Sequence, residues 1–183
     1  MKVFVNPGHS KQDPGAIGCS KATEADLVAR IGNLVVGILQ DYGWETHTLQ
    51  HDSLEYICRE ANSSKADVFV SIHANAFSDS KANGVECYSY YESKQGAELA
   101  RNIQKMLLAK LPLQDRGIKT AGFYVLCNTD MPACLVETAF VSNPRDEWLL
   151  RSRGESFAEA IAQGIINYGE GLYGKSTDSV YKV

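Results

Sequence analysis

Apolar residues recur along the chain with two periods, one typical of strands and the other of helices. Residues 2–6 form a short β-branched run, which Pro7 ends because proline lacks a backbone N–H group. Between residues 23 and 42 the apolar positions are spaced three or four apart, which predicts an amphipathic helix. The chain therefore opens with a strand, a long polar and glycine-rich connection, and a helix.

The first predicted helix carries start and stop signals. Thr23, with Asp26 three residues later, resembles a capping arrangement, and Gly43 fits the end of the helix. Glu24 is therefore expected in the first helical turn. The helix dipole alone would stabilise a carboxylate there.

The alternation of strands and helices continues through the rest of the chain. Further strands are predicted at residues 44–49, 68–72, 84–91, 123–127 and 134–140, and further helices at 52–65, around 99–107, and from Asn143 and Pro144 through an apolar stripe that ends at Leu172. The nearly continuous apolar run at 68–72 is typical of a strand covered on both faces. We therefore predict a single-domain α/β fold with a mostly parallel or mixed central sheet of about six strands and helices on both faces.

Composition narrows the class of protein. The 183 residues carry a formal net charge of −4, so no basic surplus favours binding to nucleic acid. With 44% hydrophobic and 22% charged residues the chain is typical of a globular protein, which excludes disorder of the whole chain. No apolar run reaches the ~18 residues of a membrane span, and no signal-peptide pattern is expected at the N-terminus. We expect one folded domain over residues 1–174 and a flexible tail over 175–183.

The five cysteines form no C-x-x-C pair, which argues against a dense disulfide framework and a cysteine-type zinc site. Cys127 and Cys134 are close enough in sequence to pair across a turn. Buried free thiols are the commoner outcome.

Two histidines follow predicted strands. His9 comes after the first strand and His73 directly after the strand at 68–72. Ligands collect beyond the carboxyl ends of strands in open α/β sheets, so both imidazoles reach one rim if the strands are neighbours, and Glu24 could approach them. Two nitrogens and one oxygen suit a tetrahedral zinc site with one position left for water. The alternative is that each histidine is a satisfied core residue.

Glu137 interrupts an apolar run at 134–140, where an unpaired carboxylate would be costly to bury. It should have a partner or a chemical role. Next to zinc, such a group could be tuned for proton transfer near neutral pH. The alternatives are an ion pair with Arg116 or Lys119, or exposure on an edge strand.

Cys19 offers a different chemistry, in which a thiolate activated by histidine attacks an amide carbonyl. No feature places a histidine beside it, and His47 and His51 flank a strand in polar surroundings that favour solvated side chains. A phosphate-binding role for the glycine-rich loop is disfavoured because residues 7–18 lack the G-x-G-x-x-G and G-K-[ST] patterns.

Several motifs together resemble a known family. VFVNPGH at residues 3–9, Glu24, ADVFVSIHAN at 66–75 and MPACLVETAFVSNP at 131–144 resemble the zinc-dependent N-acetylmuramoyl-L-alanine amidases of the Amidase_3 family, over residues 2 to about 172. The resemblance implies that His9, Glu24 and His73 hold Zn²⁺. It also implies that Glu137 is the catalytic carboxylate. Residues 1–174 would then be a catalytic domain that hydrolyses the amide between the lactyl group of N-acetylmuramic acid and the L-alanine of peptidoglycan.

Division-associated members of this family carry an inserted helical segment that covers the metal. Here residues 74–83 leave too little chain for one, so we predict a site that is open without an activator. The expected partner is peptidoglycan, in the bacterial cell wall, either for a phage-type endolysin or for a trimmed catalytic domain of an exported enzyme. The alternatives are a non-catalytic peptidoglycan-binding module on the same fold and a cysteine-dependent wall peptidase. The oligomeric state is left open.

Overall fold

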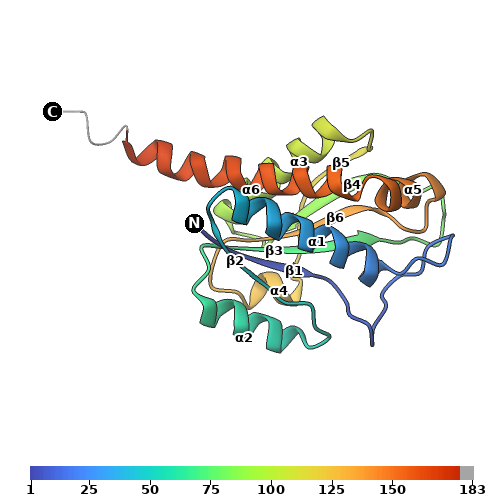
Figure 1. Ribbon diagram of the computed structural model, residues 1–183, viewed down its shortest axis with the longest axis horizontal. Coiled ribbons are helices and arrows are strands. Elements are labelled where there is room, and N and C mark those ends of the chain that lie inside the picture. Colours follow the sequence, from blue (N-terminus) through green and yellow to red (C-terminus); the bar gives the residue numbers. More distant parts are fainter. Residues whose placement is uncertain (178–183) are drawn as a thin grey trace.

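The computed structural model describes residues 1–177 and is built on one six-stranded sheet (Figure 1). The strands are β1 (Lys2–Pro7), β2 (Glu45–Thr48), β3 (Val68–Asn75), β4 (Val85–Ser89), β5 (Asp115–Thr120) and β6 (Ala133–Phe140), in the order β2-β1-β3-β6-β4-β5. All neighbouring pairs are parallel except β4 and β6, which are antiparallel. The sheet is therefore mixed, and its parallel part holds β1 and β3 side by side as predicted.

Helices cover both faces of the sheet, which confirms the predicted fold class. They are α1 (Glu24–Asp41), α2 (Leu54–Ser64), α3 (Lys94–Lys110), α4 (Tyr124–Cys127), α5 (Pro144–Ser152) and α6 (Gly154–Thr177). In Figure 1, α1, α3 and α6 lie on one face and α2 with α4 on the other. Of the tail predicted over residues 175–183, residues 178–183 lie outside the described part of the chain.

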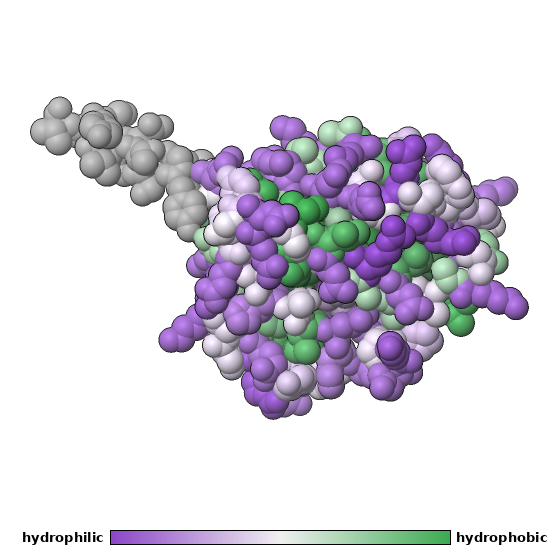
Figure 2. All heavy atoms as spheres, in the orientation of Figure 1, coloured by the Kyte–Doolittle hydropathy of each residue, from purple (hydrophilic) through white to green (hydrophobic). Residues whose placement is uncertain are grey.

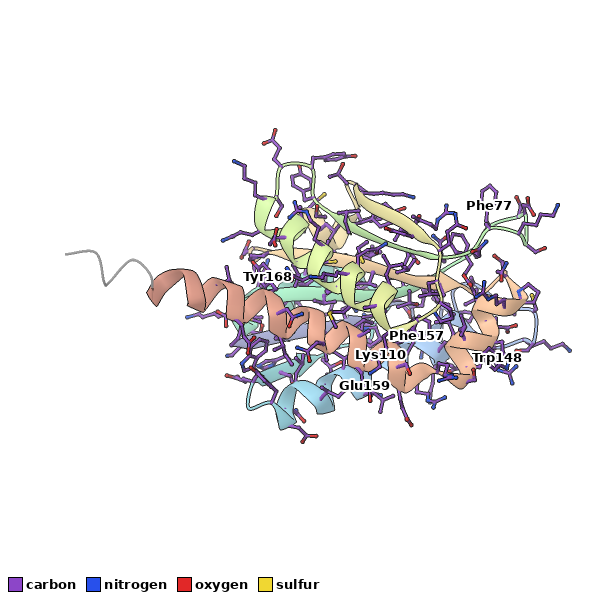
Figure 3. The ribbon with its side chains drawn as sticks, turned by 90° about the horizontal axis from the view of Figure 1, so that it is seen from above. Phe77, Lys110, Trp148, Phe157, Glu159 and Tyr168 are labelled. Carbon is purple, nitrogen blue, oxygen red and sulfur yellow. The ribbon has the colours of Figure 1, made fainter. Side chains whose placement is uncertain are left out.

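Each face has its own buried core. The larger core joins the sheet to α1, α3 and α6, and Phe157 and Tyr168 of α6 are buried in it (Figure 3). At the surface an ion pair between Lys110 and Glu159 links α3 to α6. The smaller core lies under α2 and α4. Burial of this apolar surface is the main force that holds the layers together.

The helix ends follow the capping chemistry read from the sequence. The Thr23 hydroxyl accepts a hydrogen bond from the Asp26 N–H group, so α1 begins at Glu24. Gly43 follows the end of α1 with φ of +90°, a conformation that glycine adopts without strain. Asn143 caps α5 in the same way as Thr23 caps α1. The position of Glu24 in the first helical turn is thus confirmed.

The structure differs from the predicted elements in three places. Residues 124–127 form the short helix α4 instead of a strand, because four apolar residues do not reveal whether their period is that of a helix or a strand. β5 was not predicted, because it is a half-exposed edge strand of mostly polar residues and shows no apolar run. Leu172 is 42% exposed, so the buried stripe of α6 ends before it.

On the face shown in Figure 2, hydrophobic residues form small patches over α1 and α6 among hydrophilic ones. No helix within residues 1–177 has both the length and the apolar character needed to cross a membrane.

All five cysteines are free; Cys127 and Cys134 do not pair, and Cys19 and Cys127 are exposed instead of buried.

Candidate metal centre

The carboxyl ends of β1 and β3 form the floor of the site. The two strands pair up to the end of β1, where Pro7 lies opposite Ile72 of β3. His9 follows β1 by two residues, and His73 lies within β3, which continues to Asn75. Because β1 and β3 are parallel neighbours, both histidines reach the same rim, as the sequence predicts.

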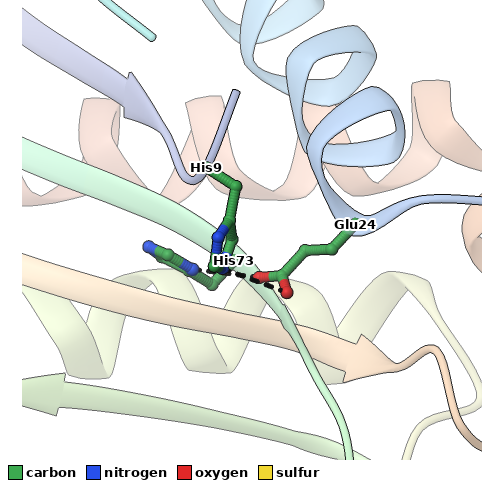
Figure 4. Close-up of side chains that lie close together, drawn as sticks. All are labelled: His9, Glu24 and His73. Atoms are coloured by element: carbon green, nitrogen blue, oxygen red, sulfur yellow. Dashed lines mark hydrogen bonds and ion pairs between the residues drawn. The ribbon is translucent and has the colours of Figure 1, made fainter. Parts of the chain in front are cut away.

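Glu24 joins the two histidines from the first turn of α1 (Figure 4). Glu24 Oε2 lies 3.2 Å from His9 Nε2, and Glu24 Oε1 lies 3.0 Å from His73 Nδ1. One donor atom from each of the three residues lies within 4.8 Å of the others. Two imidazole nitrogens and a carboxylate oxygen are a donor set that suits zinc, so the residues present fit a divalent ion.

Surrounding groups fix the orientation of two of these side chains, Glu24 and His9. The backbone N–H groups of Ala16 and Ala74 donate to the two oxygens of Glu24, each at 3.1 Å. Asp13 Oδ2 lies 2.9 Å from His9 Nδ1 and accepts a hydrogen bond from it, while Nε2 of that ring faces Glu24. Asp13 was not predicted as a site residue. Its only signal in the sequence is its position four residues after His9 in the polar loop.

Two glycines allow the loop to approach the site this closely. A Cβ atom at Gly8 would lie 2.2 Å from the ring of His73. Gly15 has φ of +66°, and a Cβ atom there would lie 2.7 Å from Glu24 Oε2. A larger residue at either position would displace a donor side chain, so these glycines are part of the site.

The electrostatics of the metal-free site follow from these contacts. The hydrogen bond to Glu24 raises the pKa of His9 to about 9, against the opposing effect of burial. Burial alone would raise the pKa of Glu24, but the hydrogen bonds from His73 and His9 outweigh it and lower that pKa well below the usual range. Glu24 is therefore ionised at neutral pH. An ionised carboxylate is the form that binds a cation.

Glu137 lies one strand further along the sheet. It is on β6, between β3 and β4, directly opposite His73 in the register. Its Oε2 atom is buried and has no hydrogen-bond partner among the described residues. Burial raises the pKa of Glu137 to about 7, which His73 partly counteracts. A carboxyl group with this pKa can both accept and donate a proton near neutral pH.

Both structural alternatives for Glu137 are wrong. β6 is an interior strand of the sheet, so Glu137 is not on an edge. Arg116 and Lys119 both pair with Glu86 on β4 instead. The sequence could not show this pairing, because β5, which carries both cations, had not been recognised as a strand.

Two cavities lie in this part of the molecule, one lined by Glu137 and the other by two of the donor histidines. One, of about 560 Å³, lies on the β4 and β5 side and is lined by Glu137, Glu86 and Arg116 among others. The other, of about 260 Å³, lies on the α2 side and is lined by His9, His73 and His51 among others. The loop between β3 and β4 is short, as expected, and it carries no helical segment. That the site needs no activator stays a prediction.

The cysteine chemistry finds no support in the geometry. Cys19 is exposed, and the contact of its Sγ atom is with the carbonyl oxygen of Ser142, at 3.6 Å. His47 lies on β2 near Glu45, and His51 lies beside Tyr56. No histidine therefore activates Cys19 in the part of the chain that the structure describes.

Comparisons with known proteins agree with this arrangement. The family model described as N-acetylmuramoyl-L-alanine amidase (Amidase_3) matches residues 3–167. The chain is 38% identical to the N-acetylmuramoyl-L-alanine amidase LytC of Bacillus subtilis, over 91% of this chain and 35% of LytC. It is 35% identical to the endolysin of Bacillus phage SPP1, over 93% of this chain and 64% of the endolysin.

Solved structures show the same fold. The N-acetylmuramoyl-L-alanine amidase AmiC2 of Nostoc punctiforme superposes with a TM-score of 0.88 at 33% identity, covering 93% of this chain and 97% of that chain. The chain spans about a third of the length of LytC and nearly all of the AmiC2 chain. With the match to the family model covering most of its length, this chain belongs to the N-acetylmuramoyl-L-alanine amidase family Amidase_3.

Proposed function

We propose that this protein is a zinc-dependent N-acetylmuramoyl-L-alanine amidase. It hydrolyses the amide bond between the lactyl group of N-acetylmuramic acid and the L-alanine of peptidoglycan, in the bacterial cell wall. His9, Glu24 and His73 hold the Zn²⁺ ion, and Glu137 is the catalytic carboxylate. The observation that carries the proposal is the convergence of these three donor atoms within 4.8 Å, next to the strand that carries Glu137, whose Oε2 atom is buried and has no hydrogen-bond partner among residues 1–177.

In the proposed reaction His9, Glu24 and His73 hold the ion, and Glu137 transfers a proton. A divalent ion at this position supplies Lewis-acid chemistry, which acidifies water and polarises an amide carbonyl. Glu137 accepts the proton of the attacking water and returns it to the leaving nitrogen. In the metal-free protein burial raises the pKa of Glu137, and a bound cation would lower it again, so these opposing effects tune a group that must take a proton and then give it up. The unpaired Oε2 atom is free for this role.

The alternative of a non-catalytic peptidoglycan-binding module is disfavoured by the same residues. A module that only binds its ligand has no use for a costly buried carboxylate beside a set of metal donors. All four residues are present, and Glu137 lies directly opposite His73 on the neighbouring strand. The relatives named above include a cell-wall amidase of a bacterium and an endolysin of a phage, and either setting suits this activity.

The test is digestion of purified peptidoglycan with the untreated, the chelated and the zinc-restored protein. We expect new N-terminal alanine amines with intact glycan strands, loss of this activity on chelation, and its return with zinc. Alkylation of Cys19 should change nothing. Activity that survives chelation but not alkylation would establish the cysteine peptidase instead, and release of no new amine by the zinc-loaded protein would leave a binding module.

Glu137→Gln separates binding of the ion from proton transfer. This substitution keeps the size of the side chain and removes its ability to carry a proton. The variant should bind zinc as the wild type does and release less than about 1% as much alanine amine, since general acid–base groups contribute roughly 10²–10⁴-fold. Turnover near the wild-type rate would show that another group moves the proton.

A further inference from the structure

The cavity beside Glu137 contains a cationic side chain that the proposed reaction does not use. We propose that Arg116 forms a subsite for a carboxylate group on the peptide side of the scissile amide. This inference rests on the proposed function, because it assigns one part of the substrate to one side of the metal centre. The group it would bind is a carboxylate carried by the residue that follows the L-alanine.

Arg116 is held in place by a buried carboxylate. Glu86 on β4 is only 3% exposed, and its Oε1 atom accepts hydrogen bonds from Asn75 at 2.9 Å and from the Tyr88 hydroxyl at 2.8 Å. Its Oε2 atom accepts a hydrogen bond from Arg116 Nε at 2.7 Å and another from Lys119. Glu86 is therefore fully satisfied, and it anchors both cations to the wall of the cavity.

The charges around Glu86 leave a positive excess. Two cations share one carboxylate, so Lys119 alone is enough to neutralise Glu86. The side chain of Arg116 is 31% exposed and lines the cavity, whereas Lys119 is not part of the lining. Asp79 and Lys81, which also line the cavity, have opposite charges. Arg116 is therefore the lining cation that neither Glu86 nor Asp79 requires, and Glu137 is the remaining carboxylate of the lining.

The guanidinium group is oriented before any ligand arrives. Its Cζ atom lies 4.8 Å from the centre of the Phe140 ring, and its Nη1 atom lies 3.5 Å from the carbonyl oxygen of Asn83. No hydrogen bond of Nη2 is found within residues 1–177. A planar group fixed by stacking and by its Nε bond loses little freedom when it binds a carboxylate, which suits Arg116 to anion recognition.

The two cavities differ in the charge of their lining residues, and this difference predicts the orientation of the bound substrate. The cavity on the α2 side is lined by His51, Leu54 and Ile57, and no lysine or arginine is among its lining residues. The cavity on the β4 and β5 side holds Arg116, and Phe77 at its outer edge is 61% exposed (Figure 3). An anionic peptide is therefore stabilised on the β4 and β5 side, and the N-acetylmuramic acid of the same substrate then lies on the α2 side.

The test uses two muramoyl peptides that differ in one group. The α-carboxyl group of the residue after the L-alanine is free in one and is a carboxamide in the other. The wild type should cleave the free acid with a kcat/KM at least about ten-fold higher, mainly through a lower KM, because a hydrogen bond to a charged group adds this much. In Arg116→Gln the preference should fall to near one while cleavage of the carboxamide is retained.

Lys119→Gln is the matched control. It removes the other cation on the same Glu86 oxygen, outside the lining of the cavity, while the guanidinium group stays in the cavity wall, so the preference for the free acid should fall by less than in Arg116→Gln. Thermal unfolding of both variants checks that each is folded. An unchanged preference in Arg116→Gln, or an equal loss in both variants, would overturn the subsite.

A binding measurement, which requires no catalytic turnover, distinguishes failure of the Arg116 subsite from failure of the proposed amidase activity. Calorimetry should show that the free peptide beginning with L-alanine binds the zinc-loaded wild type more tightly as the acid than as the carboxamide, and that Arg116→Gln removes the difference. Equal binding of the two peptides by the wild type would overturn the subsite even if the protein is an amidase. If the wild type cleaves neither muramoyl peptide, the proposed function fails, and the binding difference alone then decides on the subsite.

Discussion

At the scale of single residues, the site depends on groups that hold the donor side chains as much as on the donors themselves. Glu24 is fixed by two backbone N–H groups and His9 by Asp13. Apolar periods located the strand ends and the helix start that carry His9, Glu24 and His73, so their convergence was expected if the two strands were neighbours, and the family resemblance implied that they hold the metal. The sequence could not predict Asp13, because the path of an irregular loop has no period.

Removing Asp13 should weaken metal binding. In Asp13→Ala the His9 ring loses the acceptor that sets its tautomer and orientation, so we expect the zinc affinity to fall roughly 10–100-fold. Competition with a chromogenic chelator measures this. Asp26→Ala is the control, since the Asp26 side chain is exposed and lies outside the site. Equal affinities in the wild type and Asp13→Ala would show that the Asp13 contact does not support the ligand.

The raised pKa of Glu137 predicts how stability depends on pH. In metal-free protein the pKa rises from 4.5 to about 7, so folding favours the protonated form. This contribution is fully present below the unfolded pKa of 4.5 and is lost as the pH rises through 7. Relative to Glu137→Gln, the wild type should therefore lose about 3 kcal/mol of unfolding free energy between pH 4 and pH 8.5.

Urea unfolding in the presence of chelator, at several pH values, measures this difference. The difference between the wild type and Glu137→Gln should change most between pH 4.5 and pH 7. A difference that does not vary with pH would mean that Glu137 ionises in the folded protein as it does in water.

At the scale of elements, the sequence predicted strands and helices wherever the apolar period was long enough to read. The helices α1, α2 and α3, and all the strands except β5, were found near their expected positions. The wrong assignment of α4 and the missed strand β5 share a physical cause. α4 is too short for a period to show, and β5 is an edge strand whose half-exposed residues are mostly polar. The β5 error also hid the pairing of Arg116 with Glu86.

The close packing of α6 on α3 predicts opposite effects for two glycine substitutions. A Cβ atom at Gly164 would lie 2.5 Å from the Cα atom of Ile103, and backbone cannot move aside cheaply. Gly164→Ala should therefore destabilise the protein by roughly 1–3 kcal/mol. A Cβ atom at Gly37, within α1, would meet nothing within 4 Å, so Gly37→Ala should stabilise it by about 0.5–1 kcal/mol.

Chemical denaturation of the two variants against the wild type provides the measurement. Both changes add one methyl group to a helical glycine, so they differ mainly in what that methyl group meets. Equal shifts for Gly164→Ala and Gly37→Ala would show that α6 can move away from α3 without cost.

At the scale of the whole molecule, strand order brings the site together. His9, His73, Glu137 and Glu86 come from four strands or strand ends that are consecutive in the sheet, although they are far apart in the chain. The motifs indicated the family and the four residues of the proposed reaction. They did not indicate the two cavities, because cavity walls depend on side chains from loops and edge strands that carry no periodic signal.

The proposed reaction depends on His9, Glu24 and His73 binding one divalent ion together. Elemental analysis of purified protein, after loading with zinc and removal of excess, measures this binding. We expect about one zinc per chain in the wild type and in Glu137→Gln, and a loss of most of it in His9→Ala and in His73→Ala. One tightly held zinc per chain in both histidine variants would contradict this expectation.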